Sequence, residues 1–197
     1  MRLHPLAFVL LAFVALAACL PVSSKVPAGS TVGFKPDPVL LGSWKARDPA
    51  GSGAPGYIHF LGNEDGTMSA VLVDPPQTGN LGDYSVYHLR VAALGDNHII
   101  NVQEVNNNGK ATDGPMADEN MLFLYRADGK ATLTLYQMDD KAVAALIKSG
   151  AIAGEVEPGQ DGDIHITADA AALDAFMRTP RAGQLFSKPL VTLTRLE

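Results

Sequence analysis

The chain has 197 residues, of which 47% are hydrophobic, and its 15 basic and 21 acidic side chains give a formal net charge of −6. This length suits one ordinary domain, and the composition provides enough apolar side chains for a sizeable core. The chain is acidic and contains no basic run, which argues against nucleic acids and anionic headgroups as partners.

Residues 1–18 predict a secretion signal. Arg2 gives a cationic start, and residues 6–18 form an unbroken apolar run. As a helix, this run is only about 20 Å long, which is too short to cross a bilayer. We expect cleavage between Ala18 and Cys19.

The residues around this cleavage point, Leu16-Ala17-Ala18-Cys19, resemble the lipobox of bacterial lipoproteins. In that family the cysteine thiol receives a diacylglycerol and the freed amine receives a third fatty-acyl chain, such as palmitate. The resemblance implies permanent anchoring at Cys19, because each buried methylene contributes ~0.8 kcal/mol. Leu20 replaces the aspartate that favours inner-membrane retention, which implies an outer-membrane location facing the periplasm.

Cys19 is the only cysteine, so the chain allows neither an intramolecular disulfide nor a cysteine-based zinc site. After it, Pro21, Pro27, Pro36 and Pro38 interrupt a stretch without a sustained hydrophobic period. We therefore predict a lipidated N-terminus and flexible tether at residues 19–38, followed by a globular domain at residues 39–197.

The domain begins with short apolar or alternating segments joined by turn residues. Asn63-Glu64-Asp65-Gly66, Gly95-Asp96-Asn97 and Asp128-Gly129 predict three hairpins. The polar residues 106–119 predict the longest loop of the domain. Strands are expected at residues 39–47, 57–61, 67–73, 84–94, 98–105, 121–126 and 130–137.

The hydrophobic period then changes. Asp139 and Asp140 predict the start of a helix that Gly150 ends. Thr167 is expected to cap a second helix, which Pro180 ends. Short strands are expected at residues 152–156 and 163–167, and a last strand at residues 189–196.

This order predicts an α+β domain that is mainly antiparallel β. A single barrel-like or strongly curled sheet of about 8–10 strands, with two short helices near the C-terminus, leaves few exposed strand edges. The chain shows no fixed-period repeat, which argues against a propeller or solenoid.

The triplet Gly42-Ser43-Trp44 resembles the Gly-x-Trp of lipocalins and related calycin barrels. In that family the tryptophan closes the barrel floor, and an arginine near the chain end packs over its ring. The resemblance implies a floor pair of Trp44 and Arg195, and a barrel that carries a small apolar ligand. The alternative is that Trp44 is an ordinary core residue.

No motif predicts catalytic residues, a metal site or a cofactor. Residues 51–56 match G-x-G-x-x-G, but a strand follows them where a dinucleotide site needs a helix. His59, His88, His98 and His165 each stand alone, without the spacing of a single-stretch metal site. The sequence also lacks G-x-S-x-G and S-x-x-K.

Three hypotheses remain. The first is a non-enzymatic, lipid-anchored envelope protein that binds another protein or an envelope component. The second is a lipocalin-like carrier of a small apolar ligand. The third is an envelope hydrolase whose site is assembled from residues distant in the sequence.

Overall fold

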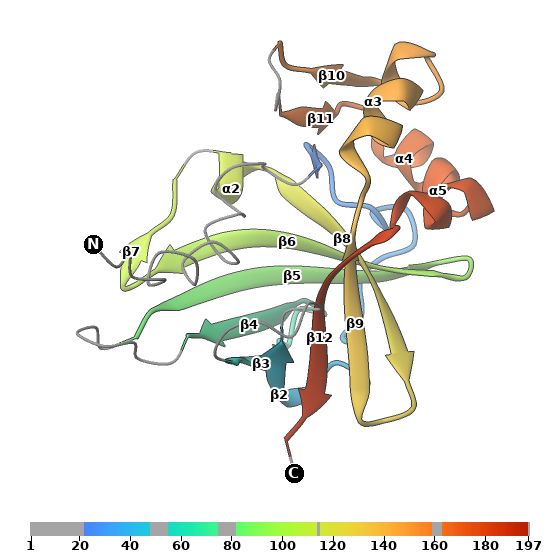
Figure 1. Ribbon diagram of the computed structural model, residues 1–197. Coiled ribbons are helices and arrows are strands. Elements are labelled where there is room, and N and C mark those ends of the chain that lie inside the picture. Colours follow the sequence, from blue (N-terminus) through green and yellow to red (C-terminus); the bar gives the residue numbers. More distant parts are fainter. Residues whose placement is uncertain (1–21, 48–54, 75–81, 114, 159–162, 197) are drawn as a thin grey trace, which may run out of the picture.

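The computed structural model describes residues 22–47, 55–74, 82–113, 115–158 and 163–196. These residues form a closed barrel of antiparallel strands (Figure 1). Each barrel strand pairs with the next along the chain, and the last pairs with the first, so the predicted barrel is confirmed. The barrel strands are β2 (Gly42–Arg47), β3 (Gly56–Gly62), β4 (Met68–Val73), β5 (Tyr84–Leu94), β6 (Asn97–Asn107), β8 (Asn120–Asp128), β9 (Thr132–Gln137) and β12 (Lys188–Arg195).

The three predicted hairpins are confirmed. They join β3 to β4, β5 to β6 and β8 to β9. Each turn contains a glycine with positive φ: Gly66 at 85°, Gly95 at 64° and Gly129 at 65°. Glycine is favoured there because a side chain would be strained in this conformation.

Four short strands extend the barrel sheet to twelve strands, which exceeds the predicted count. The polar residues 106–119 are not one long loop, because they contain the β6–β7 hairpin and the one-turn helix α2 (Pro115–Asp118). The short strands are β1 (Ser23–Ser24), β7 (Lys110–Ala111), β10 (Gly154–Val156) and β11 (Ile164–Ile166).

The region between β9 and β12 contains three helices, where the sequence predicts two: α3 (Asp140–Lys148), α4 (Ala170–Met177) and α5 (Pro180–Leu185). Asp139 caps α3 as predicted, since its carboxylate accepts a hydrogen bond from the Ala142 amide at 2.9 Å. The prediction for the second helix is wrong about its cap, which is Asp169 and not Thr167. The helix α4 ends before Pro180, as predicted, but Pro180 also begins α5, in whose first turn a missing N–H costs nothing.

The N-terminal residues 22–38 also differ from the prediction of a flexible tether. Val22 is 2% exposed, and β1 pairs with both β8 and β11. Asn101 holds Ala28 by accepting from its amide at 2.6 Å and donating to its carbonyl at 2.8 Å. Side chains distant in the sequence thus provide hydrogen bonds to the backbone of this segment. The segment therefore packs against the barrel despite its prolines.

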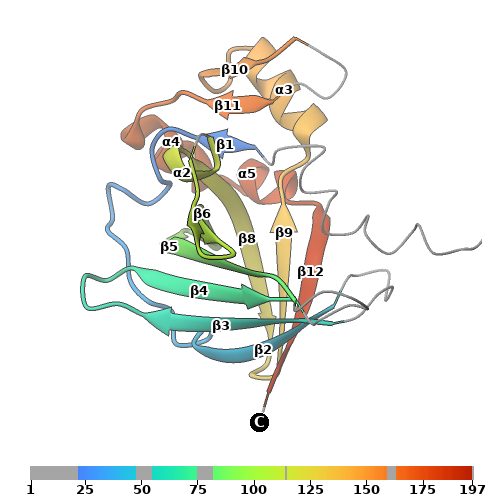
Figure 2. The ribbon, with the colours of Figure 1, turned by 90° about the vertical axis from the view of Figure 1, so that its left-hand side faces the viewer.

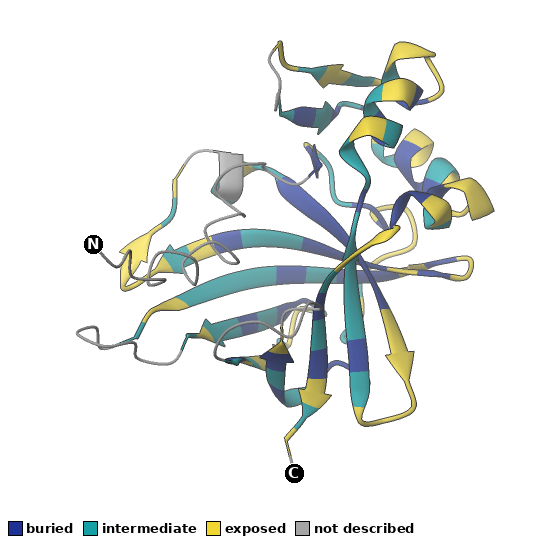
Figure 3. Cartoon of the chain, viewed as in Figure 1, coloured by how far each residue is buried: buried dark blue, intermediate teal, exposed yellow. Residues whose placement is uncertain are grey.

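The described residues form two hydrophobic cores. One lies inside the barrel, and the other lies between the outer barrel surface and the three C-terminal helices. Figure 2 shows these helices, with β10 and β11, as a layer on one side of the barrel. The protein is therefore mainly antiparallel β, with the helices packed on the outside of the barrel. The predicted α+β class describes this architecture only loosely. In Figure 3, buried and intermediate stretches alternate along several of the barrel strands.

Candidate functional site

Trp44 and Arg195 meet at one end of the barrel, which we call the closed end. Trp44 is 1% exposed, and its indole Nε1 donates to the Leu40 carbonyl at 2.7 Å. The guanidinium carbon of Arg195 lies 4.2 Å from the centroid of the indole ring. This distance is typical of a cation–π contact.

The Arg195 guanidinium also fixes the chain around Trp44. It donates to the carbonyls of Leu41 at 2.6 Å, Val39 at 2.7 Å and Lys130 at 2.9 Å. Gly42 has a φ of +107°, and a Cβ there would lie 3.0 Å from the Arg195 Nη1. The glycine of the Gly-x-Trp triplet thus leaves room for the arginine that covers the tryptophan.

The inner wall of the barrel is apolar and unevenly buried. Toward the closed end, inward-facing Met68, Leu133 and Leu193 are fully buried. Toward the other end, which we call the mouth, several side chains that pack on the same core are only partly buried. These are Ile58, Tyr87, Val102, Leu135 and Leu190.

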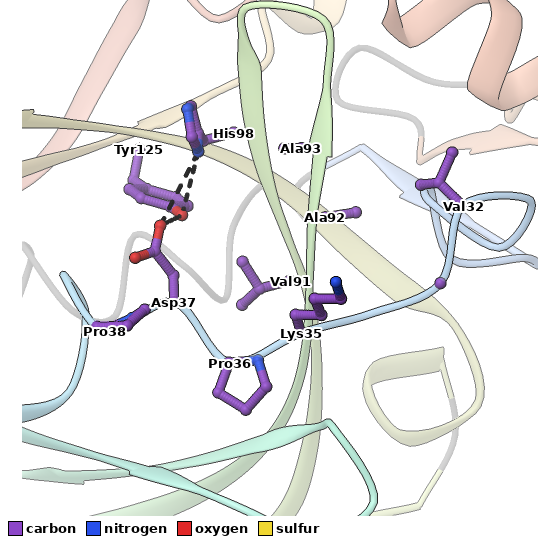
Figure 4. Close-up of a pocket in the computed structure, with 11 residues that line it drawn as sticks. Val32, Lys35, Pro36, Asp37, Pro38, Val91, Ala92, Ala93, His98 and Tyr125 are labelled. Atoms are coloured by element: carbon purple, nitrogen blue, oxygen red, sulfur yellow. Dashed lines mark hydrogen bonds and ion pairs between the residues drawn. The ribbon is translucent and has the colours of Figure 1, made fainter.

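A cavity of about 320 Å³ lies at the closed end, between residues 32–38 and the strands β5, β6 and β8 (Figure 4). Three polar side chains meet beside it. The Tyr125 hydroxyl donates to the Asp37 carboxylate, and His98 Nδ1 lies 3.4 Å from that hydroxyl and 3.9 Å from Asp37 Oδ2. The rings of His98 and Tyr125 are 5.3 Å apart in an edge-to-face arrangement.

The electrostatics of this group favour a structural role for the Tyr125 hydroxyl. Burial, followed by the hydrogen bond to Asp37 and its negative charge, raises the pKa of Tyr125 above its usual range. The hydroxyl therefore remains protonated and serves as a donor that holds Asp37. Among the residues lining the cavity, no serine, threonine or cysteine accompanies His98 as a nucleophile.

A second cluster combines Ser23, Glu119 and His165, the residue types of a hydrolytic triad. In such a triad, the serine and the acid occupy opposite nitrogens of the imidazole. Here Ser23 Oγ lies 2.9 Å and Glu119 Oε2 2.8 Å from the same nitrogen, Nδ1, and the serine hydroxyl donates to Glu119. Ser23 is also only 8% exposed. The cluster joins β1 and β11 to the chain before β8.

The charges of this cluster support a structural role. Burial by itself would raise the pKa of Glu119, but the hydrogen bonds from Ser23 and His165, with the charges of His165 and Lys25, lower it overall. The cluster has no local sequence signal, because Ser23 and His165 are 142 positions apart and neither lies in a motif.

The other predicted candidates are dispersed. His59 Nδ1 lies 2.7 Å from the Ser43 hydroxyl, in an exposed position on the outer surface. Burial and the charge of Arg90 lower the pKa of His88, against an opposing effect of Asp65. Over the described ranges, no group of three histidine, cysteine or acidic side chains is placed to hold a metal ion. None of the helices within these ranges has the length and hydropathy to cross a membrane.

The cleavage residues Ala18 and Cys19, and residues 51–54 of the glycine-rich match, lie outside the described residues. The fold and the closed end together define a closed, eight-stranded antiparallel β-barrel with a tryptophan and an arginine packed across one end. Comparison of the chain with family models, curated proteins and solved structures gives no match.

Proposed function

We propose that this protein is a lipid-anchored, non-enzymatic binding protein of the cell envelope, whose barrel holds a small apolar ligand. The observation that carries the proposal is the partial exposure of apolar inner-wall side chains toward the mouth, while Trp44 and Arg195 seal the other end. A barrel of eight strands is wide enough to hold its own side chains or one small ligand. An apolar wall with a few polar groups is typical of such sites.

Titration with Nile red, a neutral dye that fluoresces in apolar surroundings, tests this proposal. We expect saturable binding to one site. Replacing Leu135 with asparagine removes apolar contact from the inner wall and should weaken binding about ten-fold. The matched control is Thr134→Asn, on the outer face of the same strand, which should leave binding unchanged.

If Leu135→Asn and Thr134→Asn bind the dye equally, the dye-binding site lies on the outer surface. Absence of saturable binding would refute the carrier function and favour recognition of a protein by the outer surface. Far-ultraviolet circular dichroism and the Tm of each variant show whether the barrel remains folded.

The anchor is the second part of the proposal, and it is supported by the lipobox resemblance at Cys19. Cys19→Ser should abolish incorporation of labelled palmitate and move the protein from the membrane fraction to the soluble fraction. Ser24→Ala, within the domain, is the control that should retain the label. Membrane retention of unlabelled Cys19→Ser protein would contradict the anchor.

The packing of Val22 limits the distance between this anchor and the barrel. An acylated Cys19 precedes that buried residue by three positions, and three extended residues span only about 10 Å. The anchor would therefore hold the barrel close to the bilayer surface, without the reach that a tether of residues 19–38 would provide.

A further inference from the structure

Glu104 is an acidic side chain on the apolar inner wall. Along β6, Ile100, Val102 and Glu104 alternate toward the barrel interior, and Glu104 pairs with the inward-facing Tyr87 of β5. Glu104 is 8% exposed. A charged group with so little contact with water is costly unless it is paired.

Among the described residues, one side chain donates a hydrogen bond to Glu104, and this bond is long. Asn107 Nδ2 donates to its Oε1 at 3.3 Å, and Oε2 has no hydrogen-bond donor among the described residues. None of the ion pairs formed within the described part of the chain includes Glu104. Within the described residues, the Glu104 carboxylate is therefore left without a cationic partner.

A second carboxylate and an aromatic ring lie at the same end of the barrel. Asp74 continues the inward series of β4, and its Oδ1 lies 3.1 Å from the position of a Cβ on Gly56. Burial, and then the charge of Asp83, raises the pKa of Asp74. Burial also raises the pKa of Tyr87, in the same direction as the charges of Glu104 and Asp74, while a hydrogen bond with Ser85 acts against it. Tyr87 thus lies in the field of both carboxylates.

We infer that the ligand of this barrel is an apolar molecule with a cationic head, an amine or a quaternary ammonium, held by Glu104 and Asp74 beside the Tyr87 ring. Carboxylates attract such a head by charge, and an aromatic ring attracts it through its π-electrons. The partly exposed apolar wall that includes Val102 and Leu135 contacts the remainder of the molecule. This inference rests on the proposed carrier function and adds the chemical class of the ligand. It disfavours fatty acids, whose carboxylates would be repelled.

Three probes with the same alkyl chain test the inference: dodecylamine, dodecanol and dodecanoate, each below its micelle-forming concentration, displacing Nile red from the full-length protein. Dodecylamine should displace the dye at a concentration at least about ten-fold below that of dodecanoate, with dodecanol between them. Glu104→Gln should remove most of the preference for the amine and leave dodecanol unchanged, whereas Glu104→Asp, which keeps the charge, should retain the preference. The matched control is Glu155→Gln, since Glu155 is the exposed residue of β10.

The outcomes distinguish the two proposals. Equal displacement by the amine and the alcohol, or an unchanged preference in Glu104→Gln, overturns the cationic ligand while the carrier function stands. Failure of the protein to bind Nile red, with no response to any alkyl probe, overturns both. Retained preference in Glu155→Gln and lost preference in Glu104→Gln supports the inference, because both variants remove one negative charge from the protein.

Discussion

Replacing Trp44 with alanine is expected to lower the free energy of unfolding by about 3–5 kcal/mol. The indole is 1% exposed, and its removal leaves a cavity at the closed end that the paired strands cannot fill. It also deprives the Arg195 guanidinium of the ring beneath it. Because Trp44 is the only tryptophan, unfolding should be followed in urea by circular dichroism instead of fluorescence.

A matched pair of arginine variants separates the contribution of Arg195 from that of the indole. Arg195→Met loses the contact with Trp44 and three hydrogen bonds to backbone carbonyls, and should cost about 2 kcal/mol. Arg126→Met is the control, since Arg126 is exposed and lies 4.9 Å from the Tyr136 ring on the outer surface. It should cost less than about 1 kcal/mol. A loss below about 1 kcal/mol for Trp44→Ala would show that the closed end does not stabilise the barrel.

The barrel strands and hairpins could be predicted because their signals are local. Apolar or alternating segments mark the strands, and Gly66, Gly95 and Gly129 mark the turns that reverse the chain. The proximity of Trp44 and Arg195 had no such local signal. It followed from the resemblance of the Gly-x-Trp triplet to calycin barrels, and the structure places the two side chains in contact.

The sequence pattern does not identify Glu104 as an inward-facing, buried residue, and the reason is physical. Near the end of β6, the inward Glu104 is polar and buried, while the outward Val105 is apolar and 43% exposed. This reverses the usual relation between hydrophobicity and burial on which strand patterns depend. The neighbouring bulge between Val86 and Tyr87 also shifts the pairing there, and no local sequence signal gives that shift.

The packed N-terminal segment depends on Asp174, a buried residue of α4 that sequence analysis did not single out. Asp174 is 0% exposed, and its carboxylate accepts from the amides of Gly29 at 2.5 Å and Thr31 at 2.8 Å, and from the Thr31 hydroxyl at 2.5 Å. Gly29 has a φ of +104°, and a Cβ there would lie 2.2 Å from the Cβ of Ala92. The turn thus fits tightly against β5 and supplies three donors to one carboxylate.

Asp174→Ala is therefore expected to destabilise the protein by about 3 kcal/mol, because it leaves the buried Gly29 amide without an acceptor. Asp169→Ala, which removes the exposed cap of the same helix, should cost only about 1 kcal/mol. Hydrogen exchange gives a more specific measurement, since the amides of Gly29 and Thr31 should lose protection in Asp174→Ala and keep it in Asp169→Ala. Retained protection in Asp174→Ala would show that Asn101 and β1 hold the segment without the carboxylate. If protection is lost, Asp174 decides whether the residues after Cys19 pack against the barrel or become the tether that their prolines predict.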